Sequence, residues 1–141
     1  MYCKLKIEIE EKEIELEAII DTGNFLRDPI TRMPVIVVEK EALKQILPDS
    51  LLDNLHEIIS GKDVDIGEYL SKIRIIPFTS LGKENGLLIG IKATRVWVNH
   101  NQEITEIKNI IVGIYNGTLS KINRYSALIG LGILEEDTLV Q

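Results

Sequence analysis

The tripeptide Asp21-Thr22-Gly23 contains the residue types in this sequence that could carry out catalysis. It follows the apolar run at residues 16–20, which is typical of a strand that ends in a tight turn. In such a turn the Asp21 carboxylate could act as acid or base toward a water molecule. The Thr22 hydroxyl could brace the loop, and Gly23 allows the backbone to turn sharply. Aspartic peptidase chemistry needs two carboxylates, so two copies of the chain would have to meet.

The tripeptide also has a purely structural interpretation, because Asp, Thr and Gly all favour surface turns. Two hypotheses therefore stay open. In the first, two chains form an aspartic endopeptidase, and each contributes Asp21. In the second, the chain is a non-catalytic β-barrel domain used for interaction or regulation, since a fold does not fix a function. Cleavage of a precursor peptide, and its loss in Asp21→Asn, would distinguish the two.

Composition limits the classes of protein to which the chain can belong. Its 141 residues fit a single domain over residues 1–141, and hydrophobic residues make up 45%, which suits a globular protein with a true core. The formal net charge of -6 argues against nucleic acid as a partner, because binding to phosphates requires a basic surface. No apolar stretch reaches the ~18 residues that span a bilayer, so this segment is expected to be soluble.

Cysteine and histidine usage predicts no disulfide, metal or cofactor. Cys3 is the only cysteine, which excludes a disulfide within the chain and fits a reducing compartment. His56 and His100 are the only histidines and have no neighbours at metal-ligand spacing. The dipeptide Asn116-Gly117 is interpreted as a hairpin turn.

The first half of the sequence predicts a β-hairpin, a short strand and two helices. Strict alternation of apolar and charged residues indicates strands at residues 4–10 and 13–20, and the second of these leads to Asp21. A short buried strand is expected at residues 35–38. The predicted helices are residues 39–47, ended by Pro48, and residues 50–61, capped by Ser50 and closed by Gly61.

The second half is predicted to be mostly β. Residues 72–79 and 87–98 should form the two arms of a hairpin with turn-forming glycines at its tip. The tip consists of Leu81, Gly82, Lys83, Glu84, Asn85 and Gly86. A further strand region is expected at residues 104–115, interrupted by Gly113, and an apolar segment follows at residues 125–134.

The order of these features resembles the retroviral-type aspartic peptidases. Their β-hairpin, Asp-Thr-Gly loop, flap hairpin, strand pair and apolar-apolar-Gly segment correspond to residues 4–20, 21–23, 73–98, 107–119 and 128–130. The resemblance implies a mostly-β, retropepsin-like acid protease β-barrel monomer with a small helical insertion. It also implies that Leu128, Ile129 and Gly130 pack behind the Asp-Thr-Gly loop, and that the tip at residues 81–86 binds substrate as a flap.

A longer pattern is more specific. It reads Asp21-Thr22-Gly23-Asn24-x-Leu26-x-Asp28-Pro29-x-Thr31-x-x-Pro34-Val35, and it is similar to the sporulation sigma-E factor processing peptidases. In that family a membrane-embedded N-terminal part precedes a C-terminal aspartic peptidase domain, and this chain is similar to the C-terminal domain only. The resemblance implies a protease, active as a homodimer, that removes the N-terminal pro-segment of an inactive sigma factor during sporulation.

The same resemblance implies where the full-length protein acts and with which partners. The domain is expected on the cytoplasmic side of the cell membrane, joined to it only through the missing N-terminal part. A secreted forespore signal protein is expected to activate the full-length enzyme.

Three features depart from the retroviral pattern. Leu131 follows Gly130 where retroviral enzymes often carry an arginine, the flap tip lacks their glycine-rich sequence, and the insertion at residues 39–60 is larger. We therefore expect the isolated domain to dimerise weakly, because a membrane-held partner would supply a high effective concentration. The hairpin tip is expected to be the most mobile segment near the site.

Overall fold

The computed structural model describes residues 1–23, 26–79 and 85–140, of which 136–140 are described by their backbone alone. The strands are β1 (Tyr2–Ile9), β2 (Lys12–Asp21), β3 (Val35–Glu39), β4 (Ile73–Thr79), β5 (Asn85–Lys92), β6 (Arg95–His100), β7 (Glu103–Ile107), β8 (Ile111–Tyr115) and β9 (Ala127–Gly130). The helices are α1 (Asp49–Leu52), α2 (Leu55–Ile59), α3 (Leu131–Val140) and the 3-10 helices η1 (Lys40–Leu43) and η2 (Gly67–Lys72).

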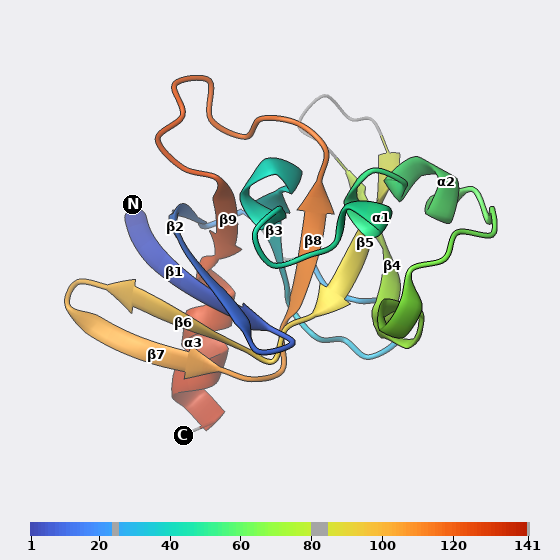
Figure 1. Cartoon of the computed structure of the whole chain (residues 1–141). Coiled ribbons are helices and arrows are strands. Elements are labelled where there is room, and N and C mark those ends of the chain that lie inside the picture. The colour runs from blue at the N-terminus through green and yellow to red at the C-terminus, as the bar shows by residue number, and fades with distance from the viewer. Residues whose placement is uncertain (24–25, 80–84, 141) are drawn as a thin grey trace.

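The strands form one mixed sheet in the order β4-β5-β8-β3-β9-β2-β1-β6-β7. Two neighbouring pairs, β2 with β9 and β3 with β8, are parallel. Figure 1 shows the hairpin of β6 and β7 at one side of the molecule and α1 and α2 at the other. This arrangement confirms the predicted fold class, a mostly-β domain of the retropepsin-like type with a small helical insertion. Within the described ranges, no helix is both long and apolar enough to cross a membrane.

The predicted hairpin that leads to Asp21 is confirmed. Strands β1 and β2 pair antiparallel up to Ile9 and Lys12, which face each other beside the turn. Glu10 and Glu11 form this turn with φ of 50° and 67°. Positive φ at both central residues gives a turn whose twist matches that of the strands it joins. Alternation and turn geometry together fix the register that places Asp21 at the end of β2.

The predicted helices are shorter and more divided than the sequence suggested. In the range 39–47 the only helical residues are the four of η1. The helix expected at 50–61 is replaced by the two short helices α1 and α2. Pro48, not Ser50, occupies the position before α1, and no side chain caps that helix. Gly61, with φ of 82°, does follow the end of α2 as predicted. The apolar residues at helical spacing belong to separate short turns that each direct side chains into the core: Leu43, Ile46, Leu47, Leu51, Leu52 and Leu55.

The two strand regions predicted at 87–98 and 104–115 each contain two strands. The run at 87–98 separates into β5 and β6 because the backbone N–H of Thr94 donates to the Glu8 carbonyl at 2.8 Å, which carries the chain across to β1. The region at 104–115 breaks between β7 and β8, whereas Gly113 lies inside β8 and pairs with Gly90 of β5. The prediction that Gly113 interrupts this region is therefore wrong.

The interpretation of Asn116-Gly117 as a hairpin turn is also wrong. Strand β8 pairs with β3 and β5, whereas β9 pairs with β2 and β3. The two strands that flank this dipeptide are therefore not hydrogen-bonded to each other. Residues 116–126 form a crossover loop that returns the chain to the middle of the sheet, beside the strand that carries Asp21.

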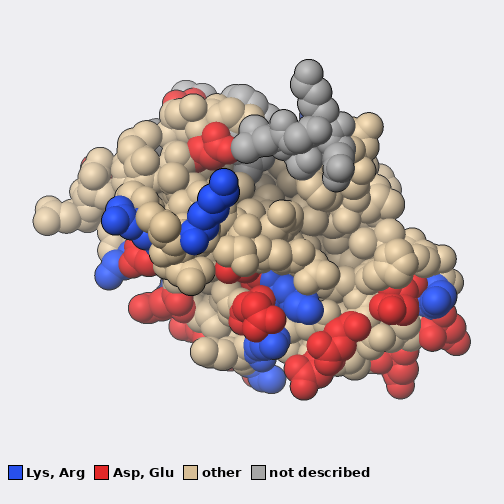
Figure 2. Space-filling model, turned by 90° about the horizontal axis from the view of Figure 1, so that it is seen from above, with Lys and Arg blue, Asp and Glu red and all other residues tan. Residues whose placement is uncertain are grey.

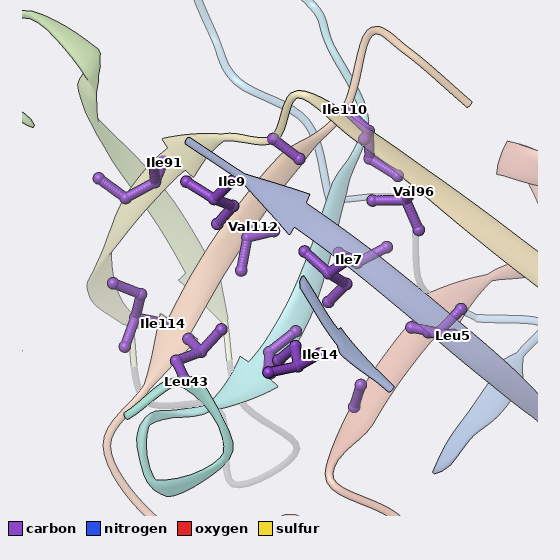
Figure 3. Close-up of a cluster of buried hydrophobic side chains, with 14 of the residues drawn as sticks. Leu5, Ile7, Ile9, Ile14, Leu43, Ile91, Val96, Ile110, Val112 and Ile114 are labelled. Atoms are coloured by element: carbon purple, nitrogen blue, oxygen red, sulfur yellow. The ribbon is translucent and has the colours of Figure 1, made fainter. Parts of the chain in front are cut away.

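The main core lies between the two halves of the curved sheet. In Figure 3, Ile7 and Ile9 of β1 lie in the same buried cluster as Val112 and Ile114 of β8. A second buried cluster lies on the other face of β3, because Val35 and Val37 point away from the main core. Its buried members are Val35, Val37, Ile76, Leu88 and Ile111. Strand β3 is therefore buried on both faces, which explains its continuous apolar sequence.

The second cluster leaves no room for a side chain at Gly90. A Cβ there would lie 2.7 Å from Ile111 Cγ2 and 3.0 Å from Ile76 Cγ1, and both isoleucines are buried. We expect Gly90→Ala to lower the free energy of unfolding by about 1–3 kcal/mol, as overpacked cores do. Urea unfolding measures this. The matched control is Gly117→Ala in the crossover loop, whose nearest Cβ neighbour would be the half-buried Tyr115 ring at 2.9 Å, a side chain that can move toward solvent. Equal stability of the two variants would contradict the packing argument.

Candidate active site

Asp21 is the last residue of β2, and its side chain is held by the turn that follows. Its Oδ1 accepts a hydrogen bond of 2.9 Å from the backbone N–H of Gly23. Asp21 is half-buried, whereas Thr22 and Gly23 are exposed. This contact fixes the carboxylate at the end of β2 while leaving it open to solvent and to a partner molecule. The same contact occurs in ordinary turns, so by itself it is compatible with both hypotheses.

Strand β9 lies directly beside the strand that ends in Asp21. It runs parallel to β2, with Ile129 opposite Ile20 and Gly130 opposite Asp21. Strand β9 also pairs antiparallel with β3, where Leu128 lies opposite Val37. Ile129 and Gly130 are buried, and Leu128 is half-buried. The segment expected behind the Asp-Thr-Gly loop is thus the structural neighbour of Asp21, although it lies far away in the sequence.

A tight turn at residues 26–35 joins the Asp21 loop to β3, and we call it the 26–35 turn. The backbone N–H of Val35 donates to the Leu26 carbonyl at 2.9 Å, and that of Asp28 donates to the Met33 carbonyl at 2.9 Å. The Asp28 carboxylate is at the centre of this turn and is only 1% exposed. It accepts hydrogen bonds from the Thr31 hydroxyl at 2.6 Å and from the Ile30 backbone N–H at 3.2 Å.

The environment of Asp28 favours its charged form. Burial raises the pKa of this carboxyl, but hydrogen bonds from Thr31 and Ile30 and the nearby Arg74 guanidinium together bring the pKa below its ordinary value. Sequence reasoning did not identify Asp28 as a structural centre, although Asp-Pro-x-Thr is a pattern with known turn chemistry. Arg74 carried no recognisable signal, because its contact with Asp28 depends on tertiary structure.

The lowered pKa predicts how Asp28 contributes to stability. A carboxyl whose pKa is lower in the folded state stabilises that state above the unfolded pKa of ~3.9. This contribution disappears as the pH falls through the lower, folded-state pKa. At pH 7 we expect Asp28→Asn to lower the free energy of unfolding by about 1–3 kcal/mol, as measured by urea unfolding. The difference should shrink in acid. The exposed Asp53→Asn is the control, and a difference that persists unchanged at low pH would contradict the assignment.

Strands β4 and β5 form the hairpin that sequence analysis interpreted as a flap, and we call these two strands the candidate flap. Their pairing runs from Ile73 and Ile91 up to Thr79 and Asn85. Most of the expected tip, Leu81, Gly82, Lys83 and Glu84, lies outside the described residues. Asn85 and Gly86 belong to β5, and the Thr79 hydroxyl donates to Asn85 Oδ1 at 2.9 Å.

A hollow connects the candidate flap with the 26–35 turn. It is lined by Leu26 of the turn and, on the candidate flap, by Pro77, Phe78, Thr79, Asn85, Gly86 and Leu87. The Phe78 ring lies against Gly86, where a Cβ would be 2.7 Å from Phe78 Cε1. In Figure 2, which is seen from above, many of the charged side chains gather along the lower edge of the molecule. The described residues that line the hollow are all uncharged, so this part of it is suited to neutral and apolar side chains.

Other groups offer weaker chemistry. Cys3 is buried, and burial together with Glu17 raises its thiol pKa to about 11, which makes it a poor nucleophile. A wider groove lies over β1, β2 and β6, where the Lys6 ammonium lies 4.2 Å from the centre of the Trp97 ring. Asp21 does not line it. Among the described residues, no group of His, Cys, Asp and Glu is arranged as a metal ion would require.

Comparison with protein families identifies the group to which these features belong. A peptidase family model, described as sporulation factor SpoIIGA, matches residues 1–133. The chain belongs to this family. The match covers β1 to β9 and includes Asp21, the 26–35 turn and the candidate flap. No solved structure matches the chain.

Two relatives are identical to the chain at about a third of the aligned positions. The sporulation sigma-E factor-processing peptidase of Priestia megaterium is 34% identical over 128 residues, which is 89% of this chain and 41% of the relative. A sporulation sigma factor-processing peptidase of Bacillus thuringiensis subsp. kurstaki is 33% identical over 129 residues, 89% of this chain and 80% of the relative. The SpoIIGA-family chain thus spans less than half the length of the Priestia relative.

Proposed function

We propose that this chain is the catalytic domain of an aspartic endopeptidase that works as a homodimer and removes the N-terminal pro-segment of an inactive sigma factor. The observation that carries the proposal is the placement of Asp21. Its carboxylate is half-buried at the end of β2, is held by Gly23, and lies beside Gly130 of β9. This occurs within a family whose relatives are named as sigma-factor-processing peptidases.

In the proposed dimer, each chain contributes one Asp21 carboxylate to a shared pair. Two carboxylates about 3 Å apart do not both ionise, so the pair holds one proton. The charged carboxylate takes a proton from the attacking water, and the protonated one donates to the carbonyl oxygen of the scissile peptide. The hydrogen bond from Gly23 keeps Asp21 in one orientation, so the carboxylate is prepared for this exchange before substrate binds.

The substrate in this proposal is an extended peptide that lies between the Asp21 loops and the candidate flap. An extended chain can form backbone hydrogen bonds with strand edges, and side-chain hollows add specificity. In the full-length protein, the domain would act on the cytoplasmic side of the membrane. There it would be held by a preceding membrane-embedded part and activated by a secreted forespore signal protein.

The direct test is cleavage of a sigma-factor precursor. The chain is incubated with the sporulation sigma-factor precursor of the same organism, and the products are identified by intact mass and by N-terminal sequencing. We expect one product shortened at its N-terminus. If a dimeric preparation leaves the precursor intact, or cuts it only within the mature region, the proposed function is wrong.

A further inference from the structure

A buried carboxylate and a cation connect the 26–35 turn with the base of the candidate flap. Arg74 is the second residue of β4, and its Nε lies 4.0 Å from Asp28 Oδ2. The Asp28 side chain is 1% exposed and that of Arg74 is 36% exposed. The two residues come from different parts of the chain, so their contact joins the 26–35 turn to β4.

The position of the Arg74 guanidinium is set by backbone carbonyls of residues just before it in the sequence. Its Nη1 donates to the Ile73 carbonyl at 3.0 Å and approaches the Ser71 carbonyl at 3.4 Å. These contacts fix the guanidinium where η2 ends and β4 begins. Arg74 therefore differs from a surface cation on a freely rotating stem, because three neighbouring groups restrict it at once. A restricted cation loses less conformational entropy when it pairs with a carboxylate.

Apolar contacts continue this connection along β4. Ile76 and Phe78 lie on the same face of β4 as Arg74, because side chains alternate along a strand. Ile76 belongs to the second buried cluster, and Phe78, Leu26 and Met33 pack against that cluster. The face of β4 that carries Arg74 is thus directed toward the 26–35 turn from the base of the strand toward its tip.

We propose that Asp28 and Arg74 are positioning residues that fix the candidate flap relative to the Asp21 loop. The 26–35 turn begins three residues after Gly23, and in this proposal its orientation also influences that of the loop that carries Asp21. Through Arg74, the same turn sets the orientation of β4. The inference rests on the proposed function for its effect on catalysis, whereas the structural coupling can be measured without any cleavage.

Substitution of Asp28 and substitution of Arg74 are expected to remove different contacts. Thr31 and Ile30 can still donate to Asp28 when Arg74 is absent, so the turn itself should form, although it should open more often once its attachment to β4 is lost. Its buried charge then loses its cation, which weakens the attachment of β4. Loss of the Asp28 charge weakens both the turn and the attachment. Arg74 variants are therefore the cleaner test of positioning.

The kinetic test compares Arg74→Met, Arg74→Lys and the wild type with a peptide from the precursor cleavage region. We expect Arg74→Met to raise KM by about threefold to tenfold with kcat per active site within about twofold. Arg74→Lys should recover part of the loss, because it restores the charge without the planar fork. A residue that only stabilises the fold would lower the folded fraction and hence the maximal rate, leaving KM unchanged. That result would overturn the proposal.

The matched control is Arg95→Met. Arg95 also lies on a strand and pairs with Glu8 at 3.0 Å and with Glu106 at 3.5 Å, but it is on β6 and lines neither the hollow nor the 26–35 turn. We expect its KM to equal that of the wild type. An equal rise in KM for Arg95→Met and Arg74→Met would show that any lost ion pair has this effect, and would overturn the specific role of Arg74.

Hydrogen exchange tests the coupling even if no cleavage occurs. In Arg74→Met, the amides of Ile30 and Thr31 should exchange at least about threefold faster. In Asp28→Asn, the backbone amides of β4 should likewise exchange at least about threefold faster than in the wild type. Faster exchange confined to the substituted segment would overturn the proposal. An inactive wild type that still shows this reciprocal change would reject the proposed function and support the positioning pair.

Discussion

Replacement of Asp21 by asparagine is expected to reduce kcat for precursor cleavage by about 10²–10⁴-fold or more, because every dimer loses both members of its acid–base pair. Asparagine has nearly the same size as aspartate, and its side-chain oxygen can still accept the Gly23 N–H that now binds Oδ1 at 2.9 Å. The turn should therefore keep its shape. What disappears is the ability to take a proton from water and to return one to the substrate.

The control for this prediction is Asp53→Asn. Asp53 is an exposed residue after α1, so its variant removes a carboxylate without touching the proposed site. Urea unfolding and sedimentation should show that both variants fold and associate as the wild type does. If folded, dimeric Asp21→Asn cleaves within a factor of ten of the wild-type rate, the catalytic role of Asp21 is rejected.

Activity of the isolated domain is expected to depend strongly on its concentration. If two chains form one site and associate weakly, the rate per chain should fall by about tenfold for each tenfold dilution below the dissociation constant of the dimer. Two copies of the chain joined by a Gly/Ser linker of about 20 residues should resist this loss. Such a linker spans on the order of 25 Å and gives a millimolar effective concentration.

The measurement is the initial cleavage rate over a dilution series, with sedimentation at the same concentrations. A rate per chain that stays constant while sedimentation shows only monomers would mean that one chain contains a complete site. A dimer that persists at nanomolar concentration would contradict the expected weak association instead. The linked protein controls for losses to surfaces or to unfolding, because it should keep its rate per site throughout the series.

The strands that lead to Asp21 could be predicted because their information is local. In β1 and β2 one face is apolar and the other is charged, and a shift of one residue would expose the whole apolar face. Leu5 and Ile7 are accordingly buried, while Lys4 and Glu17 face solvent as an ion pair at 4.0 Å. A period-2 pattern of this length has few competing structures.

The helical insertion could not be predicted in the same way. Its leucines occur at spacings that fit one face of a helix, yet Leu43, Leu51 and Leu55 are buried from three separate short helices. Short helices are not stable on their own, so tertiary packing decides where each begins and ends. The effect of Gly113 was predicted wrongly for a related reason. It was expected to break a strand, but it allows close packing, because a Cβ there would lie 3.0 Å from Val35 Cγ1.

The candidate site also contains residues that could be predicted from the sequence and residues that could not. The Asp21 turn follows from its own tripeptide, and a resemblance to known peptidases pointed to residues 128–130 as its neighbours. Arg74 could not be found from the sequence, because its contact with Asp28 exists only once the 26–35 turn and β4 have packed together. Alternation along a strand indicates which face a side chain occupies, but not which distant loop covers that face.

The central claim is that one active site contains Asp21 from two chains, and a linked dimer with a single substitution tests it most directly. Asp21→Asn is placed in one half only, and Asp53→Asn in one half of the control. The rates are measured where sedimentation shows that linked molecules do not associate further. A shared pair predicts that the single Asp21→Asn costs about 10²–10⁴-fold, whereas the control stays active. Retention of half the wild-type rate would show that each chain carries its own site, and would contradict the account.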